Sequence, residues 1–424
     1  MKYELLKEYI NSNKIDEALK KCVCLDDLSN EKKRYLTLLD RIYKKYGDDD
    51  YHFISSPGRS EIGGNHTDHQ HGNIVAATLS VDNVVVFAKR DDNIITFLDD
   101  HFDEIQIDIS DLAVKEDEKN TTASLIRGIA YKLNSEGYKI GGFNAICDSK
   151  VLIGASISSS ACFEVMIVEV FNSLFNNHEV NPVKRAIYSQ YAENNYFGKA
   201  CGLLDQLTIS VGGFVSADFK DPSNPIISNY DFSFADYGYD FLIINTKGSH
   251  ANLSSEYSAI PYEMKDVAKA LGKEVLADTN FIDFKNNLSK IREQVKNDRS
   301  IMRAFHFFKE DERAIKEKSA IENKDINTLL NLMIDSGMSS YMYLQNVYAV
   351  TNYKSQGIAI ALALSDDFIK DGAYRIQGGG FEGTIIAVVN KSDTANYVSL
   401  IESVFGEDSI LKCSIRPCGT IAII

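Results

Sequence analysis

The sequence predicts an α+β protein with two packed lobes. Helix-like and strand-like segments are mixed along the 424 residues, without the strict alternation that builds parallel βαβ sheets. The composition, 44% hydrophobic and 25% charged, is ordinary for a globular protein, and the length leaves ample residues for a core. We expect a helical extension at 1–46, a first lobe at 47–215 and a second lobe at 216–424.

Apolar residues at helical spacing are the signal for the helices. They occur in "YELLKEYI" and "RYLTLLDRIYKKYG", and Gly47 can end the second of these helices. The same pattern predicts helices at 121–137 and 160–175, and several more between 258 and 370. The apolar face of the extension needs a surface that buries it, so we expect packing on the first lobe; docking to a partner is the alternative.

Short apolar runs between polar turns indicate the strands. In chain order these runs are "VDNVVVFAKR", "NIITFLD", "GGFVSADFKD", "DFLIINTKG", "GTIIAVVN" and "CGTIAII". They occur in both expected lobes, so mixed sheets flanked by helices are expected.

Charge and cysteine usage narrow the functional class. The net charge of −15 comes without a basic run, which disfavours nucleic acid as a partner and suits a soluble protein that handles small molecules. The seven cysteines form no CxxC pair, so a reducing compartment is expected. The N-terminus lacks the apolar core of a signal peptide, and no apolar stretch is long enough to span a membrane. We therefore expect a cytoplasmic protein without membrane contact.

The stretch "SPGRSEIGGNHTDHQHGN" (56–73) gathers glycines, an arginine and three histidines. A glycine-rich turn with exposed histidines is the simplest structural interpretation. Zinc binding by His66, His69 and His71 has little support, because no cysteine or HExxH pattern accompanies them. Arg59 is better suited to hold an anion or to steer a phosphoryl group, since its guanidinium stays charged.

A glycine and four serines precede an expected long helix in "GASISSSACFEV" (154–165). The free N–H groups and the dipole at a helix N-terminus favour an anion there. One serine would be enough to cap the helix, and capping is the structural alternative. Four serines clustered with Gly154 predict a cradle for phosphate and Mg²⁺.

Two further stretches could carry chemistry. In "YAENNYFGKACGLLDQ", the carboxylates of Glu193 and Asp205 could hold Mg²⁺ or take a proton from a hydroxyl; solvated surface acids are the alternative. In "RIQGGGFEGTIIAVV", three glycines before a strand allow close approach of the backbone to a ligand, or make a tight turn.

The four stretches, in this order, resemble the galactokinases of the GHMP kinase superfamily. The galactokinase signature is close to GRVNLIGEHTDYNGG, and "GRSEIGGNHTDHQHG" keeps Gly58, Arg59, Gly64, His66, Thr67, Asp68 and Gly72. The second motif, close to PLGAGLSSSAS, is matched by "LIGASISSSAC". Four later segments also resemble the family: "AENNYFGKACGLLDQ", "NTKGSHANLSSEY", "RAFHFFKEDER" and "GGGFEG". The similarity runs from about 50 to the C-terminus.

The resemblance implies a two-lobed GHMP kinase fold with the active site between the lobes. It implies transfer of a phosphoryl group from ATP, with Mg²⁺, to the anomeric hydroxyl of galactose or a closely related sugar. A uronic acid 1-kinase acting on galacturonate, and a sugar sensor without catalysis, are the alternatives. A GHMP kinase for a non-sugar alcohol is disfavoured by "HTDH" and "CGLLDQ". Sugar and ATP are the expected partners of a monomer or weak homodimer.

The resemblance also implies roles for individual residues. Arg59 would stabilise charge on the moving phosphoryl group, and Asp205 would accept or orient the proton of the sugar hydroxyl. Ser160 and Glu193 would bind Mg²⁺. The residues expected to contact the sugar are Asn65, His66, Asp68, Asp205 and Tyr257. The residues expected to contact the nucleotide are Gly154, Ser156, Ser158, Ser159, Ser160, Ala161, Gly378, Gly379 and Gly380.

Departures from the family motifs concentrate where the sugar would lie. Asn65 replaces the glutamate that contacts the C6 hydroxyl in galactokinases, and His69 and His71 replace a tyrosine and a glycine. Losing a carboxylate and gaining imidazoles suits an acceptor such as a carboxylate at C6, hence the galacturonate hypothesis. Near the phosphates, Leu152 and Ser156 replace a proline and a glycine, and Glu382 replaces a glycine of the third motif.

Overall fold

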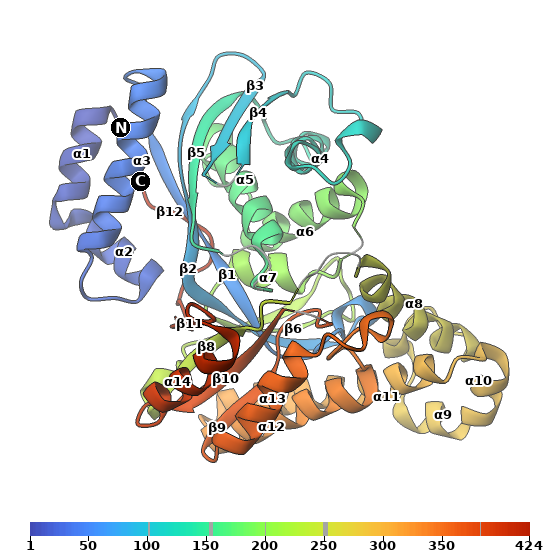
Figure 1. The fold of residues 1–424 in the computed structure, drawn as a ribbon. Coiled ribbons are helices and arrows are strands. Elements are labelled where there is room, and N and C mark those ends of the chain that lie inside the picture. The colour runs from blue at the N-terminus through green and yellow to red at the C-terminus, as the bar shows by residue number, and fades with distance from the viewer. Residues whose placement is uncertain (101, 152–155, 200, 249–252, 382) are drawn as a thin grey trace.

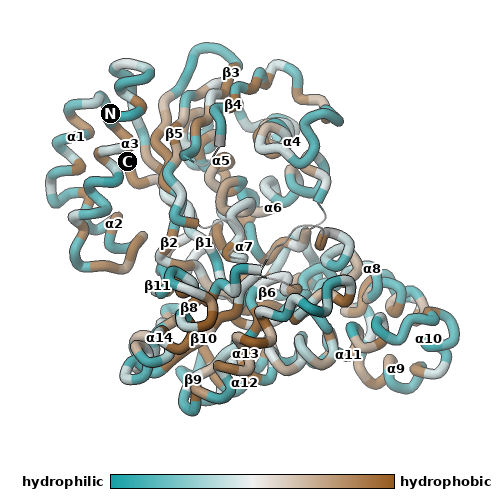
Figure 2. Tube along the Cα trace, in the orientation of Figure 1, coloured by the Kyte–Doolittle hydropathy of each residue, from teal (hydrophilic) through white to brown (hydrophobic). Residues whose placement is uncertain are grey.

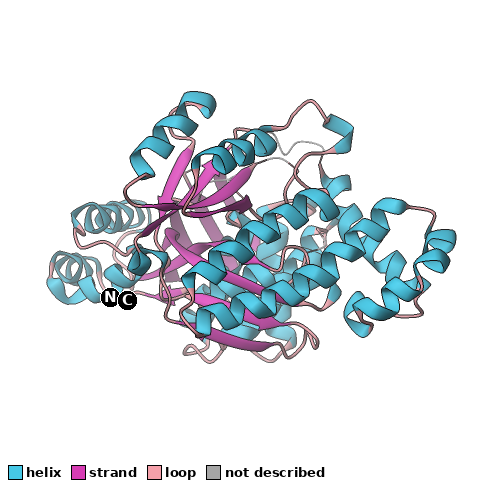
Figure 3. Cartoon of the chain, turned by 90° about the horizontal axis from the view of Figure 1, so that it is seen from below, coloured by secondary structure: helices cyan, strands magenta, loops and turns pink. Residues whose placement is uncertain are grey.

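The computed structural model describes residues 1–100, 102–151, 156–199, 201–248, 253–381 and 383–424. These residues form two β-sheets with helices packed against them (Figures 1 and 3). Hydrophobic residues are concentrated in the strands and in the helix faces that meet them (Figure 2). The predicted α+β class is confirmed.

Within the described chain the larger sheet has eight strands. Its main path is β12-β1-β2-β5-β3-β4, with β6 added on β2 and β7 added on β6. The β3–β5 pair is parallel, whereas the other pairs of this sheet are antiparallel. The strands are β1 (His52–Gly63), β2 (Asn73–Lys89), β3 (Ile94–Asp99), β4 (Phe102–Asp108), β5 (Phe143–Ser149), β6 (Phe214–Asp218), β7 (Ile226–Tyr230) and β12 (Ile421–Ala422).

Helices cover both faces of this sheet. Along β2, Val85 and Phe87 face one side and Val84 and Val86 face the other, because successive strand residues point in opposite directions. Because both faces of β2 are buried, its sequence is an almost continuous apolar run. The first side packs against α4 (Thr122–Ser135), α5 (Ser159–Phe175) and α6 (Pro182–Ala192), and α7 (Leu204–Val211) lies beside them.

The opposite side is covered by the N-terminal extension, which contains α1 (Tyr3–Asn11), α2 (Asp16–Val23) and α3 (Ser29–Tyr46). Leu6, Leu19 and Leu39 are fully buried in one cluster with Phe53 and with residues of β2. The apolar face inferred from the sequence is therefore buried against the sheet.

The second sheet has the order β11-β8-β10-β9 and is antiparallel throughout the described residues. Its strands are β8 (Tyr239–Asn245), β9 (Gly372–Ile376), β10 (Thr384–Asn390) and β11 (Ile410–Cys413). One face packs on α13 (Gly357–Phe368) and α14 (Thr394–Phe405), and the other on α11 (Asp298–Glu322) and α12 (Ile326–Ser339). The remaining helices are α8 (Ser254–Ala270), α9 (Phe281–Asn286) and α10 (Leu288–Val295). In the part of the chain that the structure describes, none of the helices has the length and apolar character to span a bilayer.

Two expectations from the sequence need comment. The glycine-rich turn that was the simplest structural interpretation of 56–73 does not describe its first half, which belongs to the buried strand β1, because β2 and β12 supply hydrogen-bonding partners that local sequence does not reveal. Membership of the larger sheet also continues beyond residue 215, through β6, β7 and the C-terminal β12. The division at 215 and 216 stays a prediction.

A buried arginine links the extension to the sheet. Arg34 of α3 donates from Nη1 to Asp82 Oδ1 at 2.6 Å and from Nη2 to the main-chain oxygens of Asp82 and Asp148 at 3.1 and 2.9 Å. The Asp82 side chain is 1% exposed. Burial acts to raise the pKa of this carboxyl, but Arg34 and Arg416 outweigh burial and hold the pKa below its usual range.

We expect Arg34→Met to lower the free energy of unfolding by about 3 kcal/mol or more, because it removes one partner of a buried carboxylate. The matched control is Arg41→Met on the same helix, since Arg41 pairs with Asp100 at the surface and such pairs contribute about 1 kcal/mol or less. Urea unfolding of both variants measures the difference. Equal losses would contradict a special role for Arg34.

Candidate active site

Arg59 and Asp205 form a two-point ion pair at the centre of the predicted site. Arg59 Nε donates to Asp205 Oδ1 at 2.7 Å, and Nη2 donates to Oδ2 at 2.8 Å. Arg59 lies on β1 at an irregularity in the pairing with β2, and Asp205 lies in the first turn of α7. The third arginine nitrogen, Nη1, donates to the Ser156 carbonyl at 2.6 Å. Two residues 146 positions apart are thus held beside the predicted phosphate loop.

Asp205 is ionised and remains accessible. Burial acts to raise the pKa of its carboxyl, but the charge and hydrogen bonds of Arg59, together with the Ser158 hydroxyl, lower that pKa overall. The Asp205 side chain is 35% exposed. A carboxylate can accept about four hydrogen bonds. Arg59 and Ser158 supply three, so Asp205 retains capacity for a ligand hydroxyl.

The serine-rich loop leads into α5 with a tightly bent backbone. Ser156 and Ser158 have φ of +52° and +61°, and α5 begins at Ser159. This places the free N–H groups of the first helical turn at the end of the loop. Ala161 is buried in the core below it. Leu152 and Gly154 lie outside the described residues.

The glycine-rich turn after β9 lies against this loop. A Cβ added to Gly378, whose φ is +61°, would lie 3.4 Å from the Ser156 carbonyl oxygen. At Gly379 a Cβ would come within 2.6 Å of the Tyr257 ring, and the Tyr257 hydroxyl donates to the Gly380 carbonyl at 2.9 Å. The predicted nucleotide segments at 156–161 and 378–380 are therefore brought together, with Tyr257 of α8 beneath the turn. Glu382 lies outside the described residues.

Ser160 and Glu193, the predicted Mg²⁺ ligands, also meet. Ser160 Oγ is 3.4 Å from Glu193 Oε1, and Glu193 begins a short π-helical turn, Glu193–Phe197. Gln206 Nε2 donates to Glu193 Oε2 at 2.9 Å and to Glu164 Oε2 at 3.0 Å. The second oxygen of Glu164 is buried without a partner among the described residues. One hydroxyl and one carboxylate suit Mg²⁺, which commonly takes one or two protein oxygens and completes its shell with water and phosphate.

Asp68 lies close to Asp205. Its Oδ2 accepts from the Leu204 N–H at 3.3 Å, and its Oδ1 accepts from the His69 N–H at 2.9 Å. A Cβ at Gly202 would fall 1.7 Å from Asp68 Oδ2, so a side chain at this position would displace the Asp68 carboxylate. Burial, assisted by the charge of Asp205, raises the pKa of Asp68 to about 6. The site thus holds two carboxylates whose pKa values are shifted in opposite directions.

The imidazoles next to Asp68 are neutral at pH 7. Burial lowers the pKa of His66 to about 4 and lowers the pKa of His69 well below its usual value. The two rings are 5.6 Å apart. His66 Nε2 lies 3.3 Å from the Gly379 carbonyl oxygen. A neutral imidazole that carries its proton on Nε2 can donate a hydrogen bond to this oxygen. Both histidines can therefore form hydrogen bonds without contributing charge.

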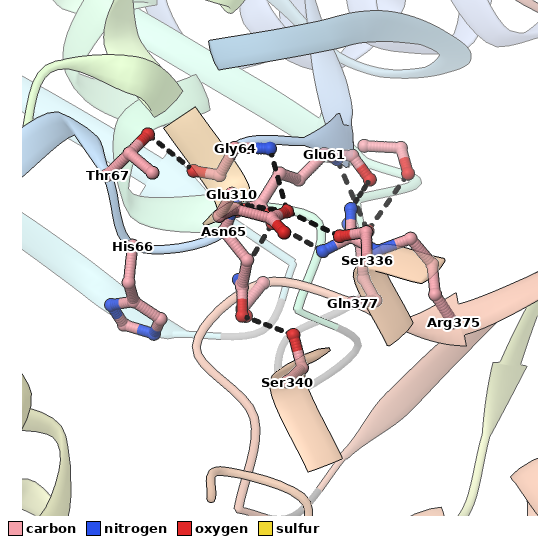
Figure 4. Close-up of polar contacts among 12 residues, drawn as sticks. Glu61, Gly64, Asn65, His66, Thr67, Glu310, Ser336, Ser340, Arg375 and Gln377 are labelled. Atoms are coloured by element: carbon pink, nitrogen blue, oxygen red, sulfur yellow. Dashed lines mark hydrogen bonds and ion pairs between the residues drawn. The ribbon is translucent and has the colours of Figure 1, made fainter. Parts of the chain in front are cut away.

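Asn65 does not lie with these groups. Its side chain is fully buried, and Nδ2 donates to Glu61 Oε1 at 2.7 Å and to the Gly378 carbonyl at 2.9 Å (Figure 4). Its Oδ1 accepts from Ser340 Oγ at 3.2 Å and from Asn346 Nδ2 at 3.1 Å. The amide is occupied by protein partners, so the geometry gives no support to the predicted contact with the C6 hydroxyl, which stays a prediction.

Comparison with known proteins agrees with this geometry. The family model "Galactokinase galactose-binding signature" matches residues 43–89, and "GHMP kinases N terminal domain" matches 124–213. A galactokinase of Clostridium tetani is 27% identical over 356 residues, which cover 82% of this chain and 86% of the relative. A galactokinase of Pyrococcus furiosus is 27% identical over 346 residues, covering 80% and 89%.

A solved structure, Lactococcus lactis galactokinase complexed with galactose, superposes with a TM-score of 0.79 at 21% identity, covering 92% of this chain and 99% of that one. The chain carries the galactokinase signature and the GHMP kinase N-terminal domain, and it is similar to galactokinases over most of its length. It is accordingly a phosphotransferase, and the relatives support a sugar kinase. A mevalonate kinase structure aligns less closely, with a TM-score of 0.60 at 14% identity.

The galactokinase signature shows an exchange that the sequence analysis missed. Where the signature GRVNLIGEHTD has asparagine and then glutamate, this galactokinase-like chain has Glu61 and then Asn65. Glu61 Oε1 accepts from Arg375 Nη2 at 2.9 Å as well as from Asn65. Reading both positions of the motif together, rather than Asn65 alone, would have revealed the exchange. In this chain the carboxylate of the two positions therefore belongs to Glu61, which is buried.

Gln377 was also missed, and it connects the same network to Arg59. Its Nε2 donates to the Ser156 carbonyl at 3.1 Å and lies 3.4 Å from the Arg59 carbonyl oxygen, while its Oε1 accepts from Ser60 Oγ at 3.0 Å (Figure 4). Only the packed structure reveals this, because residues 59, 156 and 377 are distant in the sequence.

We expect Asn65→Asp to lower the free energy of unfolding at pH 7 by about 3 kcal/mol or more, because it sets a second buried carboxylate against Glu61. The double variant Asn65→Asp with Glu61→Gln should recover most of the loss, since the glutamine amide can donate to the new aspartate. Asn11→Asp, at an exposed position, should change stability by about 0.5 kcal/mol or less. Failure of the double variant to recover would contradict the exchange.

The ionised side chain of Asp68 should lower the free energy of unfolding at neutral pH. A carboxyl whose folded pKa is about 6 binds a proton more tightly than in the unfolded chain, so its contribution to stability declines as pH rises from about 4 to 6. Relative to the native protein, Asp68→Asn should be more stabilising at pH 7.5 than at pH 4.5, by about 1 to 2 kcal/mol. Urea unfolding at both pH values measures this, and a pH-independent difference would refute it.

Proposed function

We propose that the protein is an ATP- and Mg²⁺-dependent sugar kinase that phosphorylates the anomeric hydroxyl of galactose or of a closely related neutral sugar. The observation that carries this proposal is the Arg59–Asp205 pair. It joins a fixed cation to an ionised, partly exposed carboxylate beside the serine-rich loop. Phosphoryl transfer depends mainly on such positioning and charge stabilisation.

Within this mechanism Asp205 positions the sugar. Because its pKa is lowered, it remains a carboxylate, and its free lone pair accepts a hydrogen bond from the attacking hydroxyl. It orients that oxygen and receives the proton as the bond to phosphorus forms. Arg59 is held by Asp205 and by the Ser156 carbonyl, so its charge is preorganised for the phosphoryl group.

The donor side would be formed by the loop and the glycine-rich turn. ATP with Mg²⁺ is the donor expected for this superfamily. The first N–H groups of α5 would meet phosphate oxygens, and Ser160 and Glu193 would bind the metal. Bound Mg²⁺ would neutralise charge on the donor phosphates.

A neutral sugar is favoured over a uronic acid by the charge state of the histidines. The galacturonate alternative requires a positive group near the distal end of the sugar. Burial keeps His66 and His69 uncharged at pH 7, so they offer hydrogen bonds and no charge to a carboxylate. Asp68 adds negative charge above pH 6, which favours a hydroxyl donor.

A sugar sensor without catalysis is the second candidate. A sensor needs to bind the sugar and the nucleotide but has no need of the ionised Asp205 or of the fixed Arg59. Both groups are retained in catalytically suitable geometry, which favours the kinase.

The test is a coupled assay of ADP release with Mg-ATP and a sugar panel. The panel comprises galactose, N-acetylgalactosamine, glucose, galacturonate, glucuronate and arabinose. We expect galactose or another neutral sugar to give the highest kcat/KM. Asp205→Asn should lower kcat about 10²-fold or more, because it removes the proton acceptor. Asp367→Asn, the same change at an exposed position of α13, should have no effect.

Each outcome decides between the candidates. A higher kcat/KM with galacturonate than with any neutral sugar would overturn the substrate assignment. No turnover with any sugar, accompanied by saturable sugar or ATP binding, would favour the sensor.

A further inference from the structure

Lys199 reaches from solvent into the predicted metal site. It follows Gly198, whose φ is +92°, and its Nζ lies 2.9 Å from Glu193 Oε1. That oxygen is the same one that faces Ser160 Oγ. The lysine side chain is 59% exposed, whereas the Glu193 side chain is 3% exposed. An exposed cation thus contacts a buried carboxylate.

The local backbone directs the lysine to this position. The N–H groups of Gly198 and Lys199 both donate to the Glu193 carbonyl, at 3.0 and 3.1 Å. The left-handed conformation at Gly198 ends the π-helical turn and folds the chain back over its first residue. The lysine is therefore tethered to the glutamate that it neutralises.

A cation is needed here because the surroundings are acidic. Glu193 is bridged through Gln206 to Glu164, which is fully buried and has one oxygen without a partner among the described residues. Burial, assisted by Glu193, raises the pKa of Glu164 well above its usual value, and burying the charge of Glu193 without a counter-ion is costly. The Lys199 ammonium supplies the compensating charge at Glu193.

A divalent metal would need the same oxygen. Two cations cannot share Glu193 Oε1 at contact distance without strong repulsion. Metal binding must therefore release the ammonium. The exposed lysine stem leaves it free to move, and the N-terminal turn of α5, which contains Ser160, is the adjacent anion-binding element.

We propose that Lys199 is a tethered counter-cation that occupies Glu193 in the absence of metal, competes with the metal for it, and turns to the nucleotide phosphates when released. This inference rests on the proposed function for the presence of a nucleotide and a metal. It makes Lys199 a phosphate-binding residue of the site, and it explains how the buried acids remain balanced before the donor arrives.

The competition predicts two effects of opposite sign. Lys199→Gln should bind Mn²⁺ about fivefold more tightly than the native protein, because no ion pair has to be broken. The same variant should bind ADP in the presence of saturating Mn²⁺ about fivefold more weakly, because the lysine that the metal has released no longer supplies a charge to the phosphates. Damage to the fold would weaken both affinities, so the pair of measurements separates the two explanations.

The experiment uses the full-length protein and isothermal titration calorimetry, with Mn²⁺ alone and with ADP in saturating Mn²⁺. Lys199→Arg retains the charge and should behave like the native protein. Lys184→Gln, which removes an exposed lysine of α6, should leave both affinities unchanged. The proposal is overturned if Lys199→Gln binds Mn²⁺ no more tightly than the native protein, including the case in which neither binds it. Because neither titration requires turnover, a failure of the sugar-kinase assignment would be recognised separately in the ADP-release assay.

Discussion

The ion pair between Glu61 and Arg375 is the constraint on which the site depends. It joins β1 of the larger sheet to β9 of the smaller sheet, with 2.9 Å between Glu61 Oε1 and Arg375 Nη2. Both residues are buried, so the pair is stable only while each charge is compensated by the other lobe. Arg59 lies two residues before Glu61 on the same strand. The glycine-rich turn begins three residues after Arg375. The Glu61–Arg375 ion pair therefore fixes the position of Arg59 relative to the glycine-rich turn, which faces the phosphate loop.

The same electrostatic pattern recurs through the molecule. Three carboxylates are matched by a cation from a distant segment: Asp82 by Arg34, Glu61 by Arg375 and Asp205 by Arg59. Asp68 forms no ion pair with a described residue, and burial raises its pKa to about 6. Two carboxylates at one site thus differ in mildly acidic solution, since the one paired with arginine stays charged and the other binds a proton below about pH 6. This asymmetry suits a site in which one acid orients the nucleophile while another contacts the sugar.

The exchange between positions 61 and 65 changes how the sugar end of the site is built. In the signature motif a glutamate precedes the histidine. Here Asn65 occupies that position, and its amide donates hydrogen bonds to Glu61 and to the Gly378 carbonyl in the core. The groups left facing the site are Asp68 and two neutral imidazoles. We therefore propose that sugar selectivity in this chain depends on hydrogen bonding rather than on a second charged group.

The sequence by itself determined the α+β class and the apolar faces of the helices, and its resemblance to the galactokinases singled out Arg59, Ser160, Glu193 and Asp205 as predicted site residues. Periodicity and short motifs are local properties, so they can be read without knowing the fold. The tertiary structure alone decided that β1 continues through the glycine-rich motif, that β6 and β12 join the larger sheet, and that Asn65 points inward. It also decided, through burial, that the pKa values of His66 and His69 are lowered. These properties depend on burial and on partners hundreds of residues away, as in the 314-residue separation of Glu61 and Arg375, and no local pattern encodes them.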